Sequence, residues 1–199
     1  MSHYYTNDEN LDTKVYEFKY TYKSQELKFL STSGVFSKSG IDFGSNLLIN
    51  SLPNFGNKTL LDVGCGAGVI GLTIASGNPT SNVDLIDVNK RAVDASMQNQ
   101  ALNKIKNAYC FESDLFNNVT KKYDAIITNP PIRAGKKVIY TLVDESIKYL
   151  KEGGSIYLVI QKKQGAPSME VKLNEVFGNV ETINKKNGYY IFESKKCTK

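Results

Sequence analysis

The chain has 199 residues, of which 41% are hydrophobic and 23% are charged, values that are ordinary for a soluble globular protein. This length fits one domain with a short appendage, and no apolar run approaches the ~18 residues of a membrane span. The first residues are polar and acidic without an apolar signal core, so we expect a cytoplasmic protein.

The numbers of charged, histidine and cysteine residues narrow the range of partners, metal sites and reactions that are expected for this protein. The 25 basic and 20 acidic residues give a net charge of +5, a mild lean toward polyanionic partners. His3 is the only histidine, and Cys65, Cys110 and Cys197 form no CxxC pair. A zinc site and a disulfide framework are therefore not expected. Catalysis by a histidine base is nearly excluded, so any reaction must need little proton shuttling.

Residues 1–31 are expected to form an N-terminal tail and a β-hairpin extension. Polar and apolar residues alternate from Lys14 to Leu30, and a Lys23-Ser24 turn divides the run. This pattern predicts strands near 14–22 and 26–31. The aromatic residues of the hairpin are expected to be a packing face rather than a platform for stacking bases.

Residues 32–199 are expected to form one α/β domain. It opens with a glycine- and serine-rich segment at 33–44, followed by a short helix at 45–51 that Pro53 ends. Such a segment either lies across a cofactor pocket or is a plain connector.

Strands and helices then alternate along the chain. Strands are predicted at 59–63, 82–88, 108–112, 123–128 and 155–160, the last entered through a Gly153-Gly154 turn. Helices are predicted at 69–76, 91–103 and 140–150, and from Pro167 to about 177. The helix at 91–103 is expected to turn its inner side to the sheet with Ala92, Val93, Ser96 and Ala101.

Two further segments, at 179–184 and 188–193, flank the dipeptide Asn187-Gly188. Asn-Gly is a strong hairpin turn, so an antiparallel strand pair is expected at one edge of the sheet. The fold class predicted is α/β, with a doubly wound, mostly parallel seven-stranded sheet.

The glycine-rich stretch that follows the strand at 59–63 is the most informative part of the sequence. Asp62 precedes three alternate glycines in Gly64-Cys65-Gly66-Ala67-Gly68, and a helix starts at once. A dinucleotide fingerprint has one more residue before its third glycine. A pyrophosphate here would meet the Asp62 carboxylate, whereas a cationic amino group would suit it. S-adenosylmethionine carries such an amine and no phosphate; the alternative is a glycine turn that serves packing alone.

Three acids fall at the ends of three predicted strands: Asp62, Asp87 (followed by Val88) and Asp114 (followed by Leu115). Ligands of open α/β sheets bind beyond these ends. Carboxylates only accept hydrogen bonds, which suits ribose hydroxyls and the adenine amine. Asp87 or Asn89 could instead cap the following helix. Together the three acids indicate a site for S-adenosylmethionine.

The strand at 123–128 runs into Asn129-Pro130-Pro131. Two prolines stiffen the turn and remove local N–H donors. The side-chain oxygen of Asn129 and the carbonyl of Pro130 can then converge on one NH₂ group. Such a pair would align a weakly nucleophilic amine with an activated methyl group, without a strong base. The alternative is a rigid turn.

The chain resembles the 16S ribosomal RNA guanine-N2 methyltransferases, a family of class I S-adenosylmethionine-dependent enzymes with a small methyltransferase domain. The matching stretches are Gly34-Val35-Phe36-Ser37, Asp42-Phe43-Gly44-Ser45, Asp62-Val63-Gly64-Cys65-Gly66 and Asn129-Pro130-Pro131. They cover residues 33–160, essentially the catalytic domain. Well-known members carry two tandem halves, the first degenerate, and this chain is similar to the second half alone.

The resemblance implies roles for individual residues. The cofactor would be bound by Phe36, Asp62, Gly64, Cys65, Gly66, Asp87, Val88, Asp114, Leu115 and Asn129. The target amine would be held by Asn129, Pro130, Pro131 and Ile132. Amine methyltransferases usually have an aromatic residue after Asn-Pro-Pro to stack on a flipped base; Ile132 packs on a base only weakly.

The expected partner is RNA, either 16S rRNA or the small ribosomal subunit, with phosphates contacted by Lys38, Arg133, Lys136 and Lys137. No metal and no membrane are expected, and the pattern leaves monomer and homodimer open. Two alternatives stay open: methylation of a protein glutamine amide or small-molecule amine, and a non-catalytic RNA-binding or assembly module.

Overall fold

The computed structural model describes residues 15–32, 40–131 and 134–197. In chain order its elements are β1 (Val15–Tyr22), β2 (Gln25–Thr32), α1 (Phe43–Ser51), β3 (Thr59–Val63), α2 (Val69–Gly77), β4 (Asn82–Asp87), α3 (Lys90–Leu102), β5 (Ala108–Glu112), β6 (Tyr123–Thr128), α4 (Lys136–Tyr149), β7 (Leu150–Gln161), η2 (Lys162–Gln164), α5 (Ala166–Phe177), β8 (Glu181–Lys186) and β9 (Tyr189–Lys195).

Seven strands form one sheet in the order β5-β4-β3-β6-β7-β9-β8, and β1 and β2 form a separate antiparallel pair. Strands β3 to β7 run parallel to one another, whereas β9 runs antiparallel to both β7 and β8. The predicted fold class, including the C-terminal antiparallel pair, is confirmed. Because β8 lies antiparallel to β9, it again runs parallel to β7.

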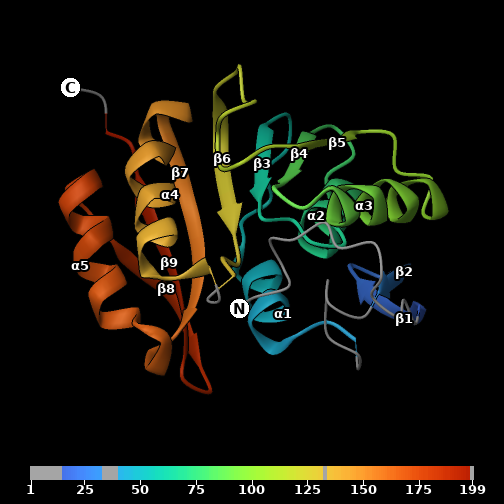
Figure 1. Ribbon diagram of the computed structural model, residues 1–199, viewed down its shortest axis with the longest axis horizontal. Coiled ribbons are helices and arrows are strands. Elements are labelled where there is room, and N and C mark those ends of the chain that lie inside the picture. The colour runs from blue at the N-terminus through green and yellow to red at the C-terminus, as the bar shows by residue number, and fades with distance from the viewer. Residues whose placement is uncertain (1–14, 33–39, 132–133, 198–199) are drawn as a thin grey trace.

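The sheet is buried on both faces, which explains the nearly continuous apolar strands. Neighbouring residues of β3 belong to different cores: Leu60 packs with residues of α1, α2 and the hairpin, and Leu61 with residues of α4 and α5. In Figure 1, α4 and α5 lie at one end of the molecule and the hairpin at the other. The ends of the parallel strands meet between these parts.

Two asparagines of α3 dock the hairpin through its backbone. Asn99 accepts from Leu30 N at 2.7 Å and donates to Leu30 O at 2.8 Å. Asn103 makes the same pair of bonds with Lys28, at 2.9 and 2.7 Å. Asn99 also donates to Ala67 O in the glycine turn at 2.9 Å, so one buried amide joins the hairpin to that turn.

The hairpin matches the sequence expectation closely. Its turn residues, Lys23 and Ser24, have φ of 46° and 66°, which suits the twist of a two-residue hairpin turn. Phe18 stacks on Phe29 with ring centroids 5.5 Å apart, and Phe29 is buried in the core. The aromatic residues are therefore a packing face, as predicted.

One face assignment on α3 was wrong. Ala101 is exposed, and Asn99 is the buried residue at this end of the helix. Nine residues separate Ala101 from Ala92, which places it on the opposite side of an α-helix, whereas seven residues bring Asn99 back to the same side.

Two element boundaries also differ. Helix α4 begins at Lys136, four residues before the predicted start, because Gly135 with φ of 87° turns the chain there. The predicted Gly153-Gly154 turn lies within β7, where the pairing with β6 is irregular. A Cβ on Gly154 would lie 3.0 Å from Asp124 O, so glycine permits this close approach.

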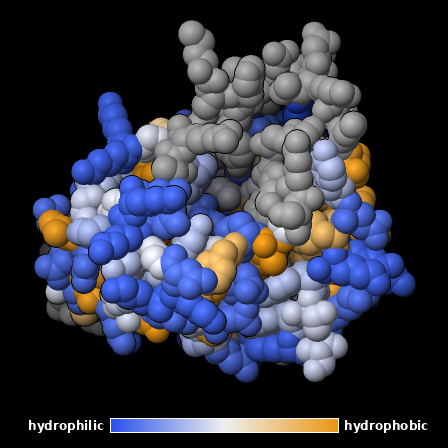
Figure 2. Space-filling model, turned by 90° about the horizontal axis from the view of Figure 1, so that it is seen from below, coloured by the Kyte–Doolittle hydropathy of each residue, from blue (hydrophilic) through white to orange (hydrophobic). Residues whose placement is uncertain are grey.

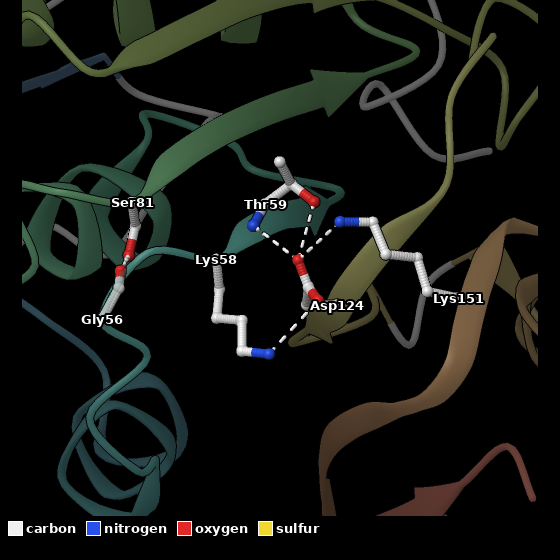
Figure 3. A network of polar contacts seen from close by, with 6 residues as sticks. All are labelled: Gly56, Lys58, Thr59, Ser81, Asp124 and Lys151. Atoms are coloured by element: carbon white, nitrogen blue, oxygen red, sulfur yellow. Dashed lines mark hydrogen bonds and ion pairs between the residues drawn. The ribbon is translucent and has the colours of Figure 1, made fainter.

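At the amino ends of the parallel strands, Asp124 ties three strands together (Figure 3). Its carboxylate accepts from Thr59 N at 2.8 Å, from Thr59 Oγ1 at 2.9 Å and from Lys151 Nζ at 2.8 Å. Burial opposes ionisation, but the Lys151 and Thr59 hydrogen bonds outweigh it and lower the pKa of Asp124 to about 2. This edge is a structural junction, distant from the glycine turn.

We predict that Asn99→Ala destabilises the protein much more than Asn103→Ala. The first change leaves part-buried backbone groups of Leu30 and the buried carbonyl of Ala67 without partners, whereas the Lys28 groups stay open to water. The expected losses are about 2–4 kcal/mol for Asn99→Ala and about 1 kcal/mol for Asn103→Ala. Urea unfolding measures both, and equal losses would contradict the docking role of Asn99.

Candidate functional site

The turn between β3 and α2 is built on glycines with left-handed backbones. Gly64, Gly66 and Gly68 have φ of 73°, 56° and 79°, which residues with a Cβ rarely adopt. The N–H groups of Gly64 and Cys65 both donate to the carbonyl of Ile86, at 2.8 and 3.0 Å. The turn is thereby fixed to the end of β4.

Asp62 lies directly beneath this turn and is only 1% exposed. Its Oδ2 accepts from Gly71 N at 2.8 Å, so the carboxylate satisfies one of the free N–H groups in the first turn of α2. Its Oδ1 is buried without a hydrogen-bond partner among the described residues. Burial, with a smaller contribution from Asp87, outweighs the Gly71 bond and raises the pKa of Asp62 to about 7. A donor or cation brought to the turn would find an acceptor there.

Asp87 closes β4 and holds the glycine turn from the other side. Its Oδ2 accepts from Gly66 N at 3.0 Å and its Oδ1 from Asn89 N at 2.9 Å. A carboxylate oxygen has two lone pairs and can accept more than one hydrogen bond. Asn89, rather than Asp87, caps α3 by accepting from Arg91 N at 3.0 Å.

The segment after β5 is held by Ser113. Its N–H donates to Asp87 O at 3.0 Å, and its hydroxyl donates to Leu115 O at 2.8 Å. The same hydroxyl accepts from Asn118 N at 3.1 Å. Leu115 takes a left-handed backbone, with φ of 47°, and Asp114 is exposed beside it. This bonded turn places Asp114 and Leu115 at the end of β5.

These segments enclose a cavity at the carboxyl ends of β3, β4 and β5, with an empty volume of about 480 Å³ that includes its open mouth. Apolar groups form most of its wall, and α4 closes one side. The lining residues are Val63, Gly64, Ile86, Asp87, Val88, Ser113, Asp114, Leu115, Pro130, Pro131, Ala134, Val138, Ile139 and Leu142.

The character of this cavity suits a nucleoside rather than a nucleotide. Its apolar walls suit a flat ring, and Asp87 and Asp114 offer acceptors for hydroxyl and amine donors. No lysine or arginine among the described residues lines it, whereas a phosphate would require cations or free N–H groups. The unpartnered oxygen of Asp62 fits an amino group, so the residues present fit S-adenosylmethionine.

Asn129 follows β6 beside the cavity, and its amide is oriented by α1. Its Nδ2 donates to Ser45 Oγ at 2.9 Å and lies 3.4 Å from Asp42 Oδ1. The same Asp42 oxygen caps α1 by accepting from Ser45 N at 2.9 Å. With the NH₂ group engaged by α1, the side-chain oxygen of Asn129 is left to accept a hydrogen bond from a ligand.

The structure brings most of the predicted cofactor residues together. Seven of the predicted residues line the cavity: Gly64, Asp87, Val88, Asp114, Leu115, Pro130 and Pro131. Asp62, Cys65 and Gly66 lie in or below the turn, and the Cys65 thiol lies 3.5 Å from Ser96 Oγ in the core. Burial raises the pKa of this thiol well above its usual value. Phe36, Lys38, Ile132 and Arg133 lie outside the described residues.

Sequence reasoning did not give a role to several residues of the site. Asp42 and Ser45 were noted as a motif, but their contact with Asn129 spans more than 80 residues of chain. The cavity wall from α4, with Ile139 and Leu142, was not foreseen. Their apolar spacing at i and i+3 indicated only a buried helix face.

We predict that ionisation of Asp62 makes the ligand-free protein less stable as the pH rises. An unfolded aspartate has a pKa near 3.9, below the folded value of about 7, so stability falls between these values and then levels off. Relative to Asp62→Asn, the wild type should lose roughly 2–3 kcal/mol of unfolding free energy from pH 5 to pH 8. Urea unfolding of both proteins at pH 5 and pH 8 measures this difference. An equal change of unfolding free energy in the wild type and in Asp62→Asn would contradict the prediction.

Comparisons with known proteins identify a matching family and similar chains. Residues 26–193 match the profile of the family described as the methyltransferase small domain. The chain is 45% identical over 198 residues to the uncharacterized protein YbxB of Bacillus subtilis (strain 168), covering 98% of each chain. It is 33% identical over 179 residues to ribosomal RNA small subunit methyltransferase C of Vibrio cholerae, covering 88% of this chain and 51% of that protein.

A solved structure shows the same fold. The T. thermophilus 16S rRNA N2 G1207 methyltransferase (RsmC), in complex with AdoMet and guanosine, superimposes with a TM-score of 0.81 at 26% identity. The match covers 92% of this chain and 50% of that chain, so this chain spans about half the length of the ribosomal RNA methyltransferases that it matches. The chain belongs to the methyltransferase small-domain family and is an RsmC-like, class I S-adenosylmethionine-dependent methyltransferase.

Proposed function

We propose that this protein transfers a methyl group to the exocyclic N2 amine of a guanine in 16S rRNA. The observation that carries the proposal is the orientation of Asn129, whose NH₂ group is held by Ser45 and Asp42 and whose oxygen is left to accept. The RNA substrates of the relatives support the choice of a guanine. The cytoplasmic location expected from the sequence is part of this proposal.

The proposed mechanism relies on positioning. The Asn129 oxygen and the Pro130 carbonyl accept the two hydrogens of the target amine and direct its nitrogen lone pair. Bound S-adenosylmethionine would supply a methyl group on a positively charged sulfur, with a neutral thioether as the leaving group. The amine becomes positively charged as it gains the methyl group, and it then loses one proton to water. Because attack creates positive charge on nitrogen, two fixed acceptors stabilise the transition state more than the free amine.

Basic residues at the carboxyl edge of the sheet favour a polyanionic substrate. Lys136-Lys137 open α4, Lys162-Lys163 form η2, and Lys185-Lys186 end β8. None of these six lysines forms an ion pair with a carboxylate in the described ranges. A lysine pair at the start of α4 also opposes the helix dipole. We infer that this positive edge contacts RNA phosphates around the site.

The surface at this edge is consistent with a polar partner. The parallel strands point downward in Figure 1, so Figure 2, seen from below, looks onto their carboxyl ends. The visible surface is largely hydrophilic, with small hydrophobic patches between polar groups. No helix among the described residues is long and apolar enough to cross a membrane.

We predict that Asp87→Ala weakens S-adenosylmethionine binding. The change removes a charged acceptor for the ribose hydroxyls and releases Gly66 N, so the dissociation constant should rise about 10- to 100-fold. Calorimetric titration at matched salt measures the change. Asp114→Ala, at an exposed position of the same cavity, should weaken binding less. Unchanged affinity of a folded Asp87→Ala would remove Asp87 from the cofactor site.

We predict that Asn129→Ala abolishes most methyl transfer and weakens cofactor binding far less. Loss of one fixed acceptor at the reacting amine should lower kcat about 100- to 1000-fold. The test uses labelled methyl transfer to small ribosomal subunits that lack the modification, followed by nucleoside analysis for N2-methylguanosine.

Other outcomes of this assay would redirect the function. If the label appears on a protein glutamine and the RNA stays unlabelled, the substrate is a glutamine amide and not a guanine. Cofactor-independent binding of RNA without methyl transfer would favour a non-catalytic assembly module. Full activity of Asn129→Ala would refute the proposed mechanism.

A further inference from the structure

Asn129 lies between two halves of the carboxyl edge. The cavity for the cofactor occupies the half above β3, β4 and β5. In the other half, Tyr189 begins β9 and pairs with Gln161, the last residue of β7. The carbonyl of Gly188 accepts from Lys162 N at 2.7 Å, which fixes the start of β9 at this edge.

The ring of Tyr189 is close to the residues that orient Asn129. A Cβ built on Gly44 would lie 3.1 Å from Tyr189 Cε1 and 3.2 Å from Asp42 Oδ1. Tyr189 Cε1 and Asp42 Oδ1 therefore lie no further apart than these two distances added together. The same Asp42 oxygen lies 3.4 Å from Asn129 Nδ2. The Asp42 carboxylate is therefore close to both the ring of Tyr189 and the amide of Asn129.

Tyr189 has the properties of a stacking surface. Its ring is half-buried and rests against Phe43, with centroids 5.3 Å apart and an interplanar angle of 46°. Its hydroxyl makes no hydrogen bond to any residue in the ranges that the structure describes. The strand below it is paired on both sides, with Gln161 and with Lys186. A ring held this firmly loses little entropy when a base stacks on it.

We propose that Tyr189 is the aromatic surface on which the target guanine stacks while Asn129 holds its amine. This inference rests on the proposed function and adds a substrate contact to it. A base taken out of its helix needs an aromatic or apolar partner to replace lost stacking. Residue 132, after Asn-Pro-Pro, is isoleucine, which leaves that contact to another part of the chain. Lys162 and Lys186 flank Tyr189 along the edge, where the phosphates of the same nucleotide strand can be contacted.

The first test compares Tyr189→Leu with Tyr190→Leu in the full chain. Tyr190 is the next residue of β9 and packs on the opposite face of the sheet, against Phe192 at 5.8 Å. Tyr189→Leu should raise the KM for the RNA substrate about tenfold or more, as expected for the loss of one base–aromatic contact. Its affinity for S-adenosylmethionine should stay that of the wild type. Tyr190→Leu should leave the KM for RNA unchanged.

The second test uses fluorescence and needs no turnover. The chain contains no tryptophan, so Tyr189→Trp carries a single tryptophan at the proposed contact, which is excited selectively at wavelengths that tyrosine does not absorb. Its emission should be quenched saturably by guanosine and not by ribose. Tyr190→Trp should show no such quenching.

The outcomes separate this inference from the proposed function. Suppose that the wild type is active, that the two leucine variants have equal KM values for RNA, and that guanosine does not quench Tyr189→Trp. These results would overturn the inference and leave the proposed function intact. A wild type that does not methylate RNA would refute the proposed function, and the guanosine titration would still decide whether a base stacks on Tyr189.

Discussion

The structure depends on two buried carboxylates beneath one glycine turn. Asp62 binds the N–H of Gly71 in α2, and Asp87 binds the N–H groups of Gly66 and Asn89. Burying two carboxylates this close together costs free energy. The hydrogen bonds from the backbone N–H groups offset only part of this cost. A Cβ on Gly71 would lie 2.9 Å from Asp62 Oδ2, so glycine there is a condition of the arrangement. A cationic amine bound at the turn would complete the compensation and would tie stability to the cofactor.

The order of the elements and the candidate cofactor site could be predicted from local patterns. Apolar runs that end in glycines or acids predicted the parallel strands, alternation of polar and apolar residues predicted the N-terminal hairpin, and Asn187-Gly188 predicted the C-terminal one. The carboxyl ends of adjacent parallel strands meet at one edge whatever the details of packing. Asp87 and Asp114 could therefore be placed together from sequence, although nothing local shows that Ser113 fixes the turn between β5 and Asp114.

Contacts between distant segments could not be derived in this way. The bond from Asn129 to Ser45 joins α1 to the loop after β6, and neither segment carries a periodicity that indicates the other. Ala101 was misassigned to the inner side of α3, and Asn99, which bonds the backbone of Leu30 there, was not assigned to that side. A polar side chain that bonds the free backbone edge of a strand does not belong to an apolar periodicity, so the sequence pattern does not indicate that it is buried.

The hairpin shows how contacts between distant segments connect the glycine turn to the rest of the fold. Leu27 and Phe29 are buried in the same core as Leu72 of α2, so β2 shares one core with the domain. Asn99 adds a polar connection from β2 to Ala67 O in the glycine turn. A displacement of β2 would leave the buried Asn99 amide without its Leu30 partners, at a cost comparable to a lost hydrogen bond. The amide that bonds the glycine turn is thus held in place in part by a strand that contributes no residue to the cavity.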